Sequence, residues 1–177
     1  MSTILLGVTG SIAAYKACEL TRLFVKAGHD VHVIMTEAAT RFVTPLTFRT
    51  LSRNPVSIDM FDAPAEWVPG HISLAERADT LVIAPCTANV IAKLAHGLAD
   101  DMLTATALAT RAPLVIAPAM NTGMWDNPAT QANLVALASR GVTFVDAATG
   151  DLACGTSGKG RMADPQAVFD AAIKCNR

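Results

Sequence analysis

The sequence predicts a three-layer α/β protein built on a doubly wound parallel sheet. Short apolar runs alternate with helical patterns along the whole chain. The runs at 81–84 and 114–117 are continuously apolar, which is typical of parallel strands covered by helices on both faces. The chain has 177 residues, long enough for one domain and short for two. We therefore expect residues 1–177 to form a single domain.

Five strands are expected, at 3–8, 31–35, 80–84, 114–117 and 142–145. The first helix is predicted over 12–27, followed by Gly28 as its stop. Its buried face is expected to hold Ile12, Leu20, Leu23, Phe24 and Ala27. Strands and helices in this order indicate a flavodoxin-like or Rossmann-like fold.

Three prolines mark further helix starts. Pro45, Pro128 and Pro165 each follow a residue that can cap a helix, namely Thr44, Asn127 and Asp164. Gly141 is expected to close the helix that begins near Pro128. Extra helical turns are predicted between the second and third strands, and 54–70 and 147–160 are the least regular stretches.

Composition excludes several classes of protein. The net charge is −1 and no run of either sign occurs, which argues against binding to nucleic acid or to a membrane surface. No apolar stretch approaches the roughly 20 residues that span a bilayer, and no signal peptide is visible, so a cytoplasmic protein is expected. Charged residues make up only 16% of the chain, which indicates a surface partly covered by other subunits.

Cysteine and histidine spacing gives no sign of a metal or disulfide site. The four cysteines are scattered without a Cys-x-x-Cys pair. His29, His32 and His96 show no ligand spacing with any Cys, Asp or Glu, so no metal is proposed. Cys18 and Cys175 are expected in helices, and Cys86 beside a ligand loop.

Ligands of open parallel sheets bind beyond the carboxyl ends of the strands. Four segments with small, hydroxyl or amide residues fall there, at 9–11, 36–38, 85–89 and 118–121. Small residues let backbone N–H groups approach an anion at a helix N-terminus. Gly10 is either a turn glycine or part of a phosphate site, and the adjacent Ser11 favours the second. The run 158–160 lacks the spacing of a nucleoside-triphosphate loop.

Three residues are candidates for chemistry. His71 follows Gly70 in a helix-like segment and is either a surface histidine or a base. Asn121 follows a buried strand and either caps a turn or holds a carboxylate or a flavin edge. Cys154 lies in a glycine-rich segment and is either an incidental loop cysteine or a thiol on a flap that closes over a substrate. Lys159 and Arg161 could lower the pKa of that thiol or meet an anionic substrate.

Four motifs together resemble the homo-oligomeric flavin-containing cysteine decarboxylases. Residues 10–16 are similar to the family's first flavin loop, and 70–72 to its histidine motif. Residues 118–125 fit its Pro-x-Met-Asn-x-x-Met-Trp pattern at every fixed position. Residues 153–162 resemble the substrate flap of the branch that serves coenzyme A biosynthesis. The family's Pro-Ala-Ser-Ala-Asn-Thr motif reads Pro-Cys-Thr-Ala-Asn-Val at 85–90, so Val90 lacks a hydroxyl.

The resemblance implies a flavoprotein domain that uses FMN to decarboxylate phosphopantothenoylcysteine. The thiol is oxidised to a thioaldehyde, carbon dioxide leaves, and the enethiol is reduced again. It implies that His71 is the base, Cys154 the proton donor, and Asn121 the carboxylate ligand, with Met120, Ala153 and Lys159 also at the substrate. The implied FMN contacts are Gly10, Ser11, Ile12, Thr36, Ala38, Thr87, Ala88, Asn89, Val90 and Met120. A homotrimer, or a dodecamer of trimers, is implied as well.

Two alternatives remain open. A peptidyl-cysteine decarboxylase of peptide-antibiotic tailoring shares the flavin loops and the Asn121 motif but typically lacks the Cys154 flap. A non-catalytic flavoprotein that serves as a regulatory subunit typically carries long acidic extensions, which this chain lacks.

Overall fold

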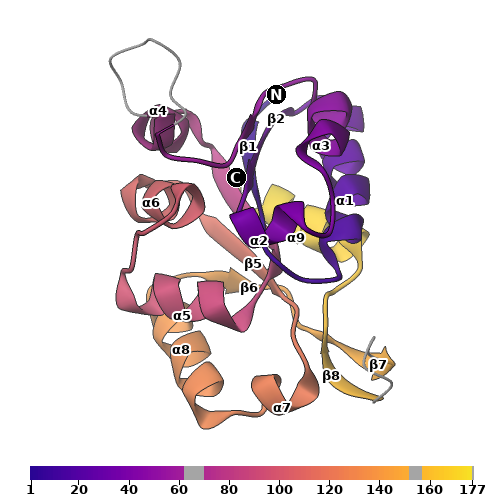
Figure 1. The fold of residues 1–177 in the computed structure, drawn as a ribbon, viewed down its shortest axis with the longest axis vertical. Coiled ribbons are helices and arrows are strands. Elements are labelled where there is room, and N and C mark those ends of the chain that lie inside the picture. The colour runs from indigo at the N-terminus through magenta and orange to yellow at the C-terminus, as the bar shows by residue number, and fades with distance from the viewer. Residues whose placement is uncertain (62–69, 152–156, 177) are drawn as a thin grey trace.

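A six-stranded parallel sheet forms the centre of the computed structural model, which describes residues 1–61, 70–151 and 157–176 (Figure 1). The strands are β1 (Thr3–Val8), β2 (Asp30–Met35), β3 (Val56–Ser57), β4 (Thr80–Cys86), β5 (Leu114–Pro118) and β6 (Thr143–Phe144). They lie in the order β3-β2-β1-β4-β5-β6, so the direction of winding reverses between β1 and β4. This order confirms the predicted doubly wound sheet.

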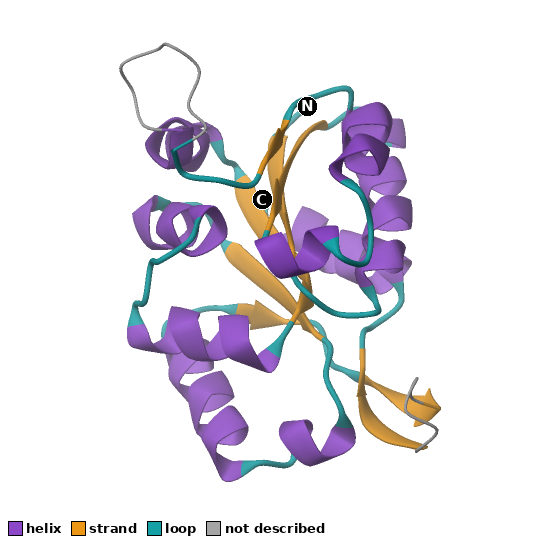
Figure 2. Cartoon of the chain, viewed as in Figure 1, coloured by secondary structure: helices purple, strands orange, loops and turns teal. Residues whose placement is uncertain are grey.

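Helices cover both faces of the sheet, as Figure 2 shows. One face carries α1 (Ala14–Lys26), α3 (Pro45–Ser52) and α9 (Pro165–Cys175). The other carries α4 (Gly70–Arg77), α5 (Ala88–His96), α6 (Met102–Ala109) and α8 (Pro128–Ser139). Two short helices, α2 (Glu37–Thr40) and α7 (Thr122–Trp125), directly follow the loops after β2 and β5.

The alternation of side chains along β1 builds a separate core on each face. Ile4 and Leu6 pack on the α1 face, and Leu5 packs on the α5 face. All three are completely buried, which stabilises the fold by about 1.5–3 kcal/mol for each side chain. The continuous apolar runs therefore follow from burial on both faces.

The start of the first helix differs from the prediction. α1 begins at Ala14, because the Ser11 hydroxyl accepts a hydrogen bond from the Ala13 N–H at 3.2 Å in a preceding turn. Ile12 lies in that turn and is 57% exposed, so its assignment to the buried face was wrong. Ala27 is also exposed, since it follows the last helical turn. Gly28 does follow the helix end, with a φ of 82°.

The proline-marked helix starts are confirmed at Pro45, Pro128 and Pro165. Asn127 and Asp164 cap their helices through side-chain oxygens, as expected. Thr44 makes no side-chain cap bond, and its hydroxyl lies 3.3 Å from that of Thr47 instead.

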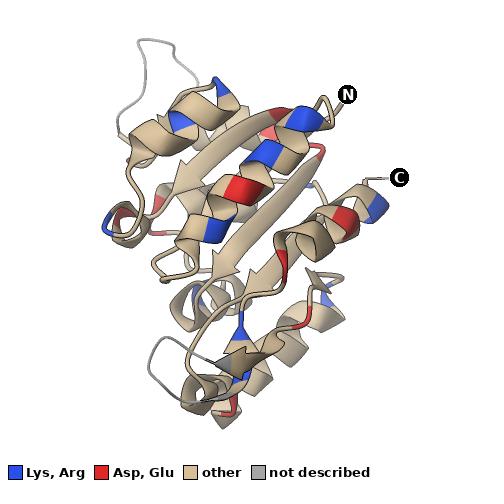
Figure 3. Cartoon of the chain, turned by 90° about the vertical axis from the view of Figure 1, so that its right-hand side faces the viewer, with Lys and Arg blue, Asp and Glu red and all other residues tan. Residues whose placement is uncertain are grey.

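The stretch expected to be irregular at 147–160 contains an antiparallel hairpin. Its strands are β7 (Ala148–Asp151) and β8 (Ser157–Arg161), which pair with each other beside α7 (Figure 1). The two-residue edge strand β3 was also missed, in the stretch 54–70. Acidic and basic residues are interspersed on the face in Figure 3. Among the described residues, no helix has the length and apolar character needed to cross a membrane.

Candidate active site

A cavity of about 440 Å³ opens beyond the carboxyl ends of β1, β2 and β4. Its volume falls in the range of small-molecule and cofactor sites, roughly 300–1,000 Å³. Six of its lining residues belong to the predicted FMN contacts: Gly10, Thr36, Ala38, Thr87, Asn89 and Val90. The other four are Glu37, Lys93, Asp101 and Met124. Loops far apart in sequence thus meet at one site.

The loops after β1 and β2 touch at this cavity. A Cβ atom at Gly10 would lie 2.6 Å from the Cβ of Ala38, so no side chain larger than hydrogen fits without a shift. Gly10 lies in the loop before α1, and the dipole of that helix favours an anion near its N-terminus. The close packing of these two loops therefore requires glycine at position 10.

Two predicted contact hydroxyls also cap helices. Thr36 accepts from the Ala39 N–H at 3.3 Å, and Thr87 accepts from the Val90 N–H at 3.4 Å. A hydroxyl group both donates and accepts. Its O–H can therefore still donate to an acceptor oxygen of a bound ligand at the cavity.

Lys93 of α5 and Asp101, which precedes α6, form a charged wall along one side of the cavity. Lys93 Nζ lies 2.7 Å from Asp100 Oδ1 and 2.9 Å from Asp101 Oδ2. Asp101 also caps α6, because its Oδ1 accepts from the Thr104 N–H at 2.8 Å. This wall was not predicted from the sequence, although an Asp directly before an apolar helical run is a cap signal.

Hydrogen bonds keep the charged wall ionised. Burial alone would raise the pKa of Asp101, but the bonds from the Thr104 N–H and from Lys93 outweigh it and lower that pKa. The pKa of Lys93 is raised, first by its bond to Asp100, against a smaller opposing effect of burial. Both groups therefore carry their charges at neutral pH.

Asp101→Ala is expected to lower the free energy of unfolding at pH 7 by about 1–3 kcal/mol, because it removes a helix cap and a half-buried ion pair. The folded-state pKa of Asp101 is depressed. Its stabilisation is thus complete above the unfolded pKa of about 3.9 and is lost as the pH falls through the folded value. Denaturant unfolding of wild type and variant, repeated between pH 2.5 and pH 7 in steps of about half a pH unit, would measure the difference in the free energy of unfolding.

Asp164→Ala is the matched control, because Asp164 caps α9 through the Gln166 N–H at 2.9 Å but makes no salt bridge within 4.0 Å among the described residues. It removes a cap alone, which costs about 1 kcal/mol. An Asp101→Ala effect no larger than this, or one that persists unchanged at pH 2.5, would contradict the role of the ion pair.

The remaining predicted FMN contacts are not among the lining residues of the cavity. Ser11 and Ile12 follow Gly10 in the same loop, and Ala88 is the first residue of α5 after Thr87. Met120 lies in the loop after β5, where it packs partly against the core on the α5 face.

The predicted substrate residues that the structure describes lie on β8 and in the loop that leads into α7. Asn121 caps α7 by accepting from the Gly123 N–H at 2.8 Å. The Met120 N–H donates to the Gly160 carbonyl at 2.9 Å, which docks β8 on the loop after β5. Lys159 Nζ lies 5.2 Å from the centroid of the Trp125 ring, within cation–π range. Met120, Asn121 and Lys159 therefore share one region, and Met124 of α7 extends it to the cavity.

His71 lies in the first turn of α4, as the helix-like pattern predicts, and is not among the lining residues of this cavity. Its Nδ1 is buried and has no hydrogen-bond partner among the described residues. Ala153 and Cys154 fall between β7 and β8 in the sequence and lie outside the described residues.

The other three cysteines lie where the sequence predicts them. Cys86 is fully buried at the end of β4, and burial raises the pKa of its thiol. Burial also raises the pKa of Cys18, which lies in α1 as expected. Cys175 ends α9. A raised pKa disfavours the reactive thiolate, so none of these features indicates a nucleophile.

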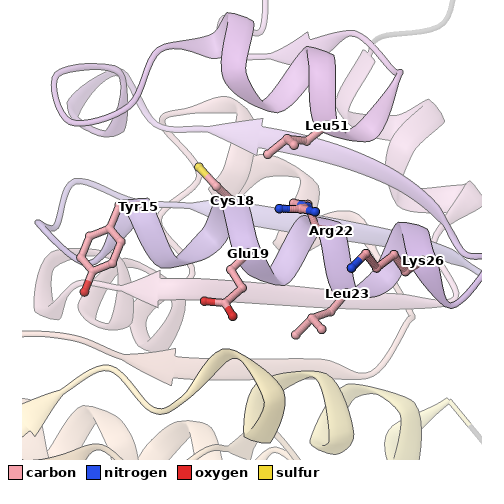
Figure 4. A pocket seen from close by; sticks show the side chains of 7 residues that line it. All are labelled: Tyr15, Cys18, Glu19, Arg22, Leu23, Lys26 and Leu51. Carbon is pink, nitrogen blue, oxygen red and sulfur yellow. The ribbon is translucent and has the colours of Figure 1, made fainter.

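A second hollow lies on the outer face of α1, where Leu51 of α3 faces Tyr15, Cys18, Glu19, Arg22, Leu23 and Lys26 (Figure 4). No strand-end loop contributes to it. The cavity at the ends of β1, β2 and β4 is therefore the better candidate.

Comparison with known proteins agrees with this fold and site. The model of the family described as Flavoprotein matches residues 1–176. The coenzyme A biosynthesis bifunctional protein CoaBC of Bacillus subtilis (strain 168) is 52% identical over 171 residues, which are 97% of this chain and 42% of that protein. The chain thus spans about two fifths of the length of that relative.

Solved structures are similar over nearly the whole chain. A PPC decarboxylase mutant complexed with pantothenoylaminoethenethiol has a TM-score of 0.87 and 33% identity, covering 98% of this chain and 97% of that one. The FMN-dependent cysteine decarboxylase SpaF has a TM-score of 0.85 and 32% identity, covering 100% and 98%. From the family match and these full-length similarities, we conclude that the chain belongs to the Flavoprotein family.

Proposed function

We propose that residues 1–177 form an FMN-dependent decarboxylase domain that converts phosphopantothenoylcysteine to phosphopantetheine. The observation that carries the proposal is the cavity at the strand ends, which is lined by six of the residues assigned to the flavin. The similarity to PPC decarboxylase over 98% of the chain supports the substrate. The relation to CoaBC supports a place in coenzyme A biosynthesis.

The residues at the cavity fit FMN. Gly10 lets the loops after β1 and β2 pack together at the cavity, and the dipole of α1 favours a phosphate near its N-terminus. The hydroxyls of Thr36 and Thr87 offer donors to the polar groups of the ligand. FMN, when bound, supplies the oxidising and reducing power that decarboxylation of a saturated thiol needs.

The protein side chains supply binding and proton transfer. His71 takes a proton from the substrate during oxidation of the thiol. Asn121 holds the substrate carboxylate, and its fixed position at the start of α7 orients that group. Met120 and Ala153 are assigned to substrate binding as well. Lys159, held over Trp125, attracts the anionic end of the substrate.

Mass spectrometry of phosphopantothenoylcysteine incubated with the FMN-loaded protein tests the proposal. The expected product is the saturated thiol formed by loss of carbon dioxide. A peptide with a C-terminal cysteine is the comparison substrate. Decarboxylation of the peptide alone would overturn the proposed substrate, and failure of the protein to bind added FMN would overturn the proposed function.

Cys154→Ser is expected to release a product two hydrogens lighter than the wild-type product. We assign Cys154 to protonate the enethiol carbon, and a serine hydroxyl is a far weaker acid than a thiol of pKa about 8.5. Oxidation and decarboxylation use His71 and should continue. Anaerobic mixing followed by mass analysis measures both products. Cys18→Ser is the control, since Cys18 lies in α1. Formation of the saturated product at the wild-type rate would remove Cys154 from the mechanism.

We also propose that the protein assembles as a homotrimer, or as a dodecamer of trimers, and works in the cytoplasm. Leu98, Leu108 and Val135 are 56%, 63% and 69% exposed, and burial between subunits would remove these apolar side chains from water. Light scattering that shows an active monomer at micromolar concentration would contradict the assembly, and cell fractionation tests the location.

A further inference from the structure

We propose that Thr9, which is not among the predicted contacts, is a positioning residue that holds the loops of the flavin site together. The inference rests on the proposed FMN function. Thr9 directly follows β1 and precedes Gly10 of the cavity. Its side chain points into the protein rather than into the cavity lining, because Thr9 is completely buried and is not one of the lining residues.

The Thr9 hydroxyl makes two hydrogen bonds to the loop after β4. It donates to the Pro85 carbonyl at 2.7 Å and accepts from the Thr87 N–H at 3.0 Å. These partners flank Cys86, 76 and 78 positions away in sequence. One buried oxygen thus joins the loop after β1 to the loop after β4.

The connection between these loops continues across the site through backbone hydrogen bonds. The Cys86 carbonyl accepts from the Ala119 N–H at 2.9 Å, in the loop after β5. The Met120 N–H next to it donates to the Gly160 carbonyl of β8 at 2.9 Å. Thr9 therefore stands at the start of a chain of contacts that runs from the flavin loops to the proposed substrate region.

Thr87 connects this chain to the cofactor. It lines the cavity, and its hydroxyl accepts from the Val90 N–H at the start of α5. When Thr9 holds the Thr87 backbone, the loop has its ligand-binding form before the ligand arrives. Binding then does not have to order the loop, which is the cost that preorganisation removes.

Thr9→Val keeps the shape of the side chain but removes the hydroxyl. The Pro85 carbonyl and the Thr87 N–H then lose a partner in a buried setting, where an unpaired polar group is costly. The loop after β4 then moves so that these two groups can hydrogen-bond to water. FMN binding must return the loop to its original position. We expect the Kd for FMN to rise by about tenfold to a hundredfold.

Thr21→Val is the matched control. Thr21 is also completely buried and also donates to a backbone carbonyl, that of Ala17 at 2.7 Å, but both residues lie within α1. It should destabilise the apoprotein while leaving the Kd for FMN within about threefold of wild type, because its bond joins no loops of the site.

The experiment is titration of each apoprotein with FMN, followed by flavin fluorescence, together with thermal unfolding of each apoprotein. Thr9→Ser keeps the hydroxyl and should restore the Kd to within about threefold of wild type. If Thr9→Val does not fold, Thr9→Ala against Thr9→Ser gives the same comparison. A Thr9→Val or Thr9→Ala protein that is destabilised but binds FMN with wild-type Kd overturns the inference.

The wild-type titration separates this inference from the proposed function. Failure of wild-type protein to bind FMN would overturn the proposed function, and the inference with it. Tight binding by wild type together with unchanged binding by the Thr9 variants would overturn the inference alone.

Discussion

Replacing His71 with asparagine is expected to slow release of carbon dioxide from phosphopantothenoylcysteine by about a hundred- to ten-thousand-fold, the usual range for loss of a general base. The Nδ1 atom of His71 is buried and lacks a partner among the described residues, so the ring is not committed there to a structural hydrogen bond. Asparagine has a similar size but no basic nitrogen. Manometric or isotopic detection of carbon dioxide measures the rate.

His96→Asn is the control for this substitution. His96 is exposed in the last turn of α5 and is not one of the cavity residues, so its replacement should leave the rate unchanged. The His71→Asn protein should still bind FMN, because His71 does not line the cavity. A rate within threefold of wild type would exclude His71 as the base.

The sheet could be predicted because its strands are buried on both faces. The run 3–8 is predicted with the bounds that β1 has in the structure. The helix starts at Pro128 and Pro165 follow from local capping chemistry and are also confirmed. These features depend on neighbouring residues, which a sequence shows directly.

The hairpin of β7 and β8 could not be predicted, because its sequence carries no such local signal. β8 has the sequence Ser-Gly-Lys-Gly-Arg, which carries no alternation of apolar residues. A hydrogen bond from the Met120 N–H, in the loop between β5 and α7, to the Gly160 carbonyl holds it instead. Ile12 shows the same limit, since its exposure depends on the turn at Ser11 that delays α1.

The part of the candidate site that is formed by loops at the strand ends could be predicted. Gly10, Thr36 and Thr87 meet there because parallel strands end at one edge of the sheet. The wall of Lys93 and Asp101 depends on how α5 packs against α6, which periodicity does not reveal. The grouping of Asn121 with Lys159 depends in turn on the docking of the hairpin.

Gly160→Ala is therefore expected to have a large effect on the substrate side of the site. Gly160 has a φ of 139°, which side-chain-bearing residues rarely adopt, and its new Cβ would overlap the Met120 carbonyl oxygen. Relief requires β8 to move away from the loop after β5. This movement would break the Met120–Gly160 bond and separate Lys159 from Trp125.

Gly141→Ala isolates the backbone strain from this collision. Gly141 has a φ of 84°, and a Cβ there would meet no atom within 4 Å, so the variant should lose about 1 kcal/mol of stability and keep its KM.

Gly160→Ala should raise the KM for phosphopantothenoylcysteine by about tenfold or more, because Asn121 and Lys159 no longer act together. FMN affinity should change less than the KM, since the new Cβ meets Met120 and Asn121 rather than a residue that lines the cavity. Steady-state kinetics and FMN titration of both variants measure these effects. An unchanged KM in Gly160→Ala would show that substrate binding does not require the docked hairpin, and parallel losses of FMN affinity and substrate binding would show that β8 supports the whole site.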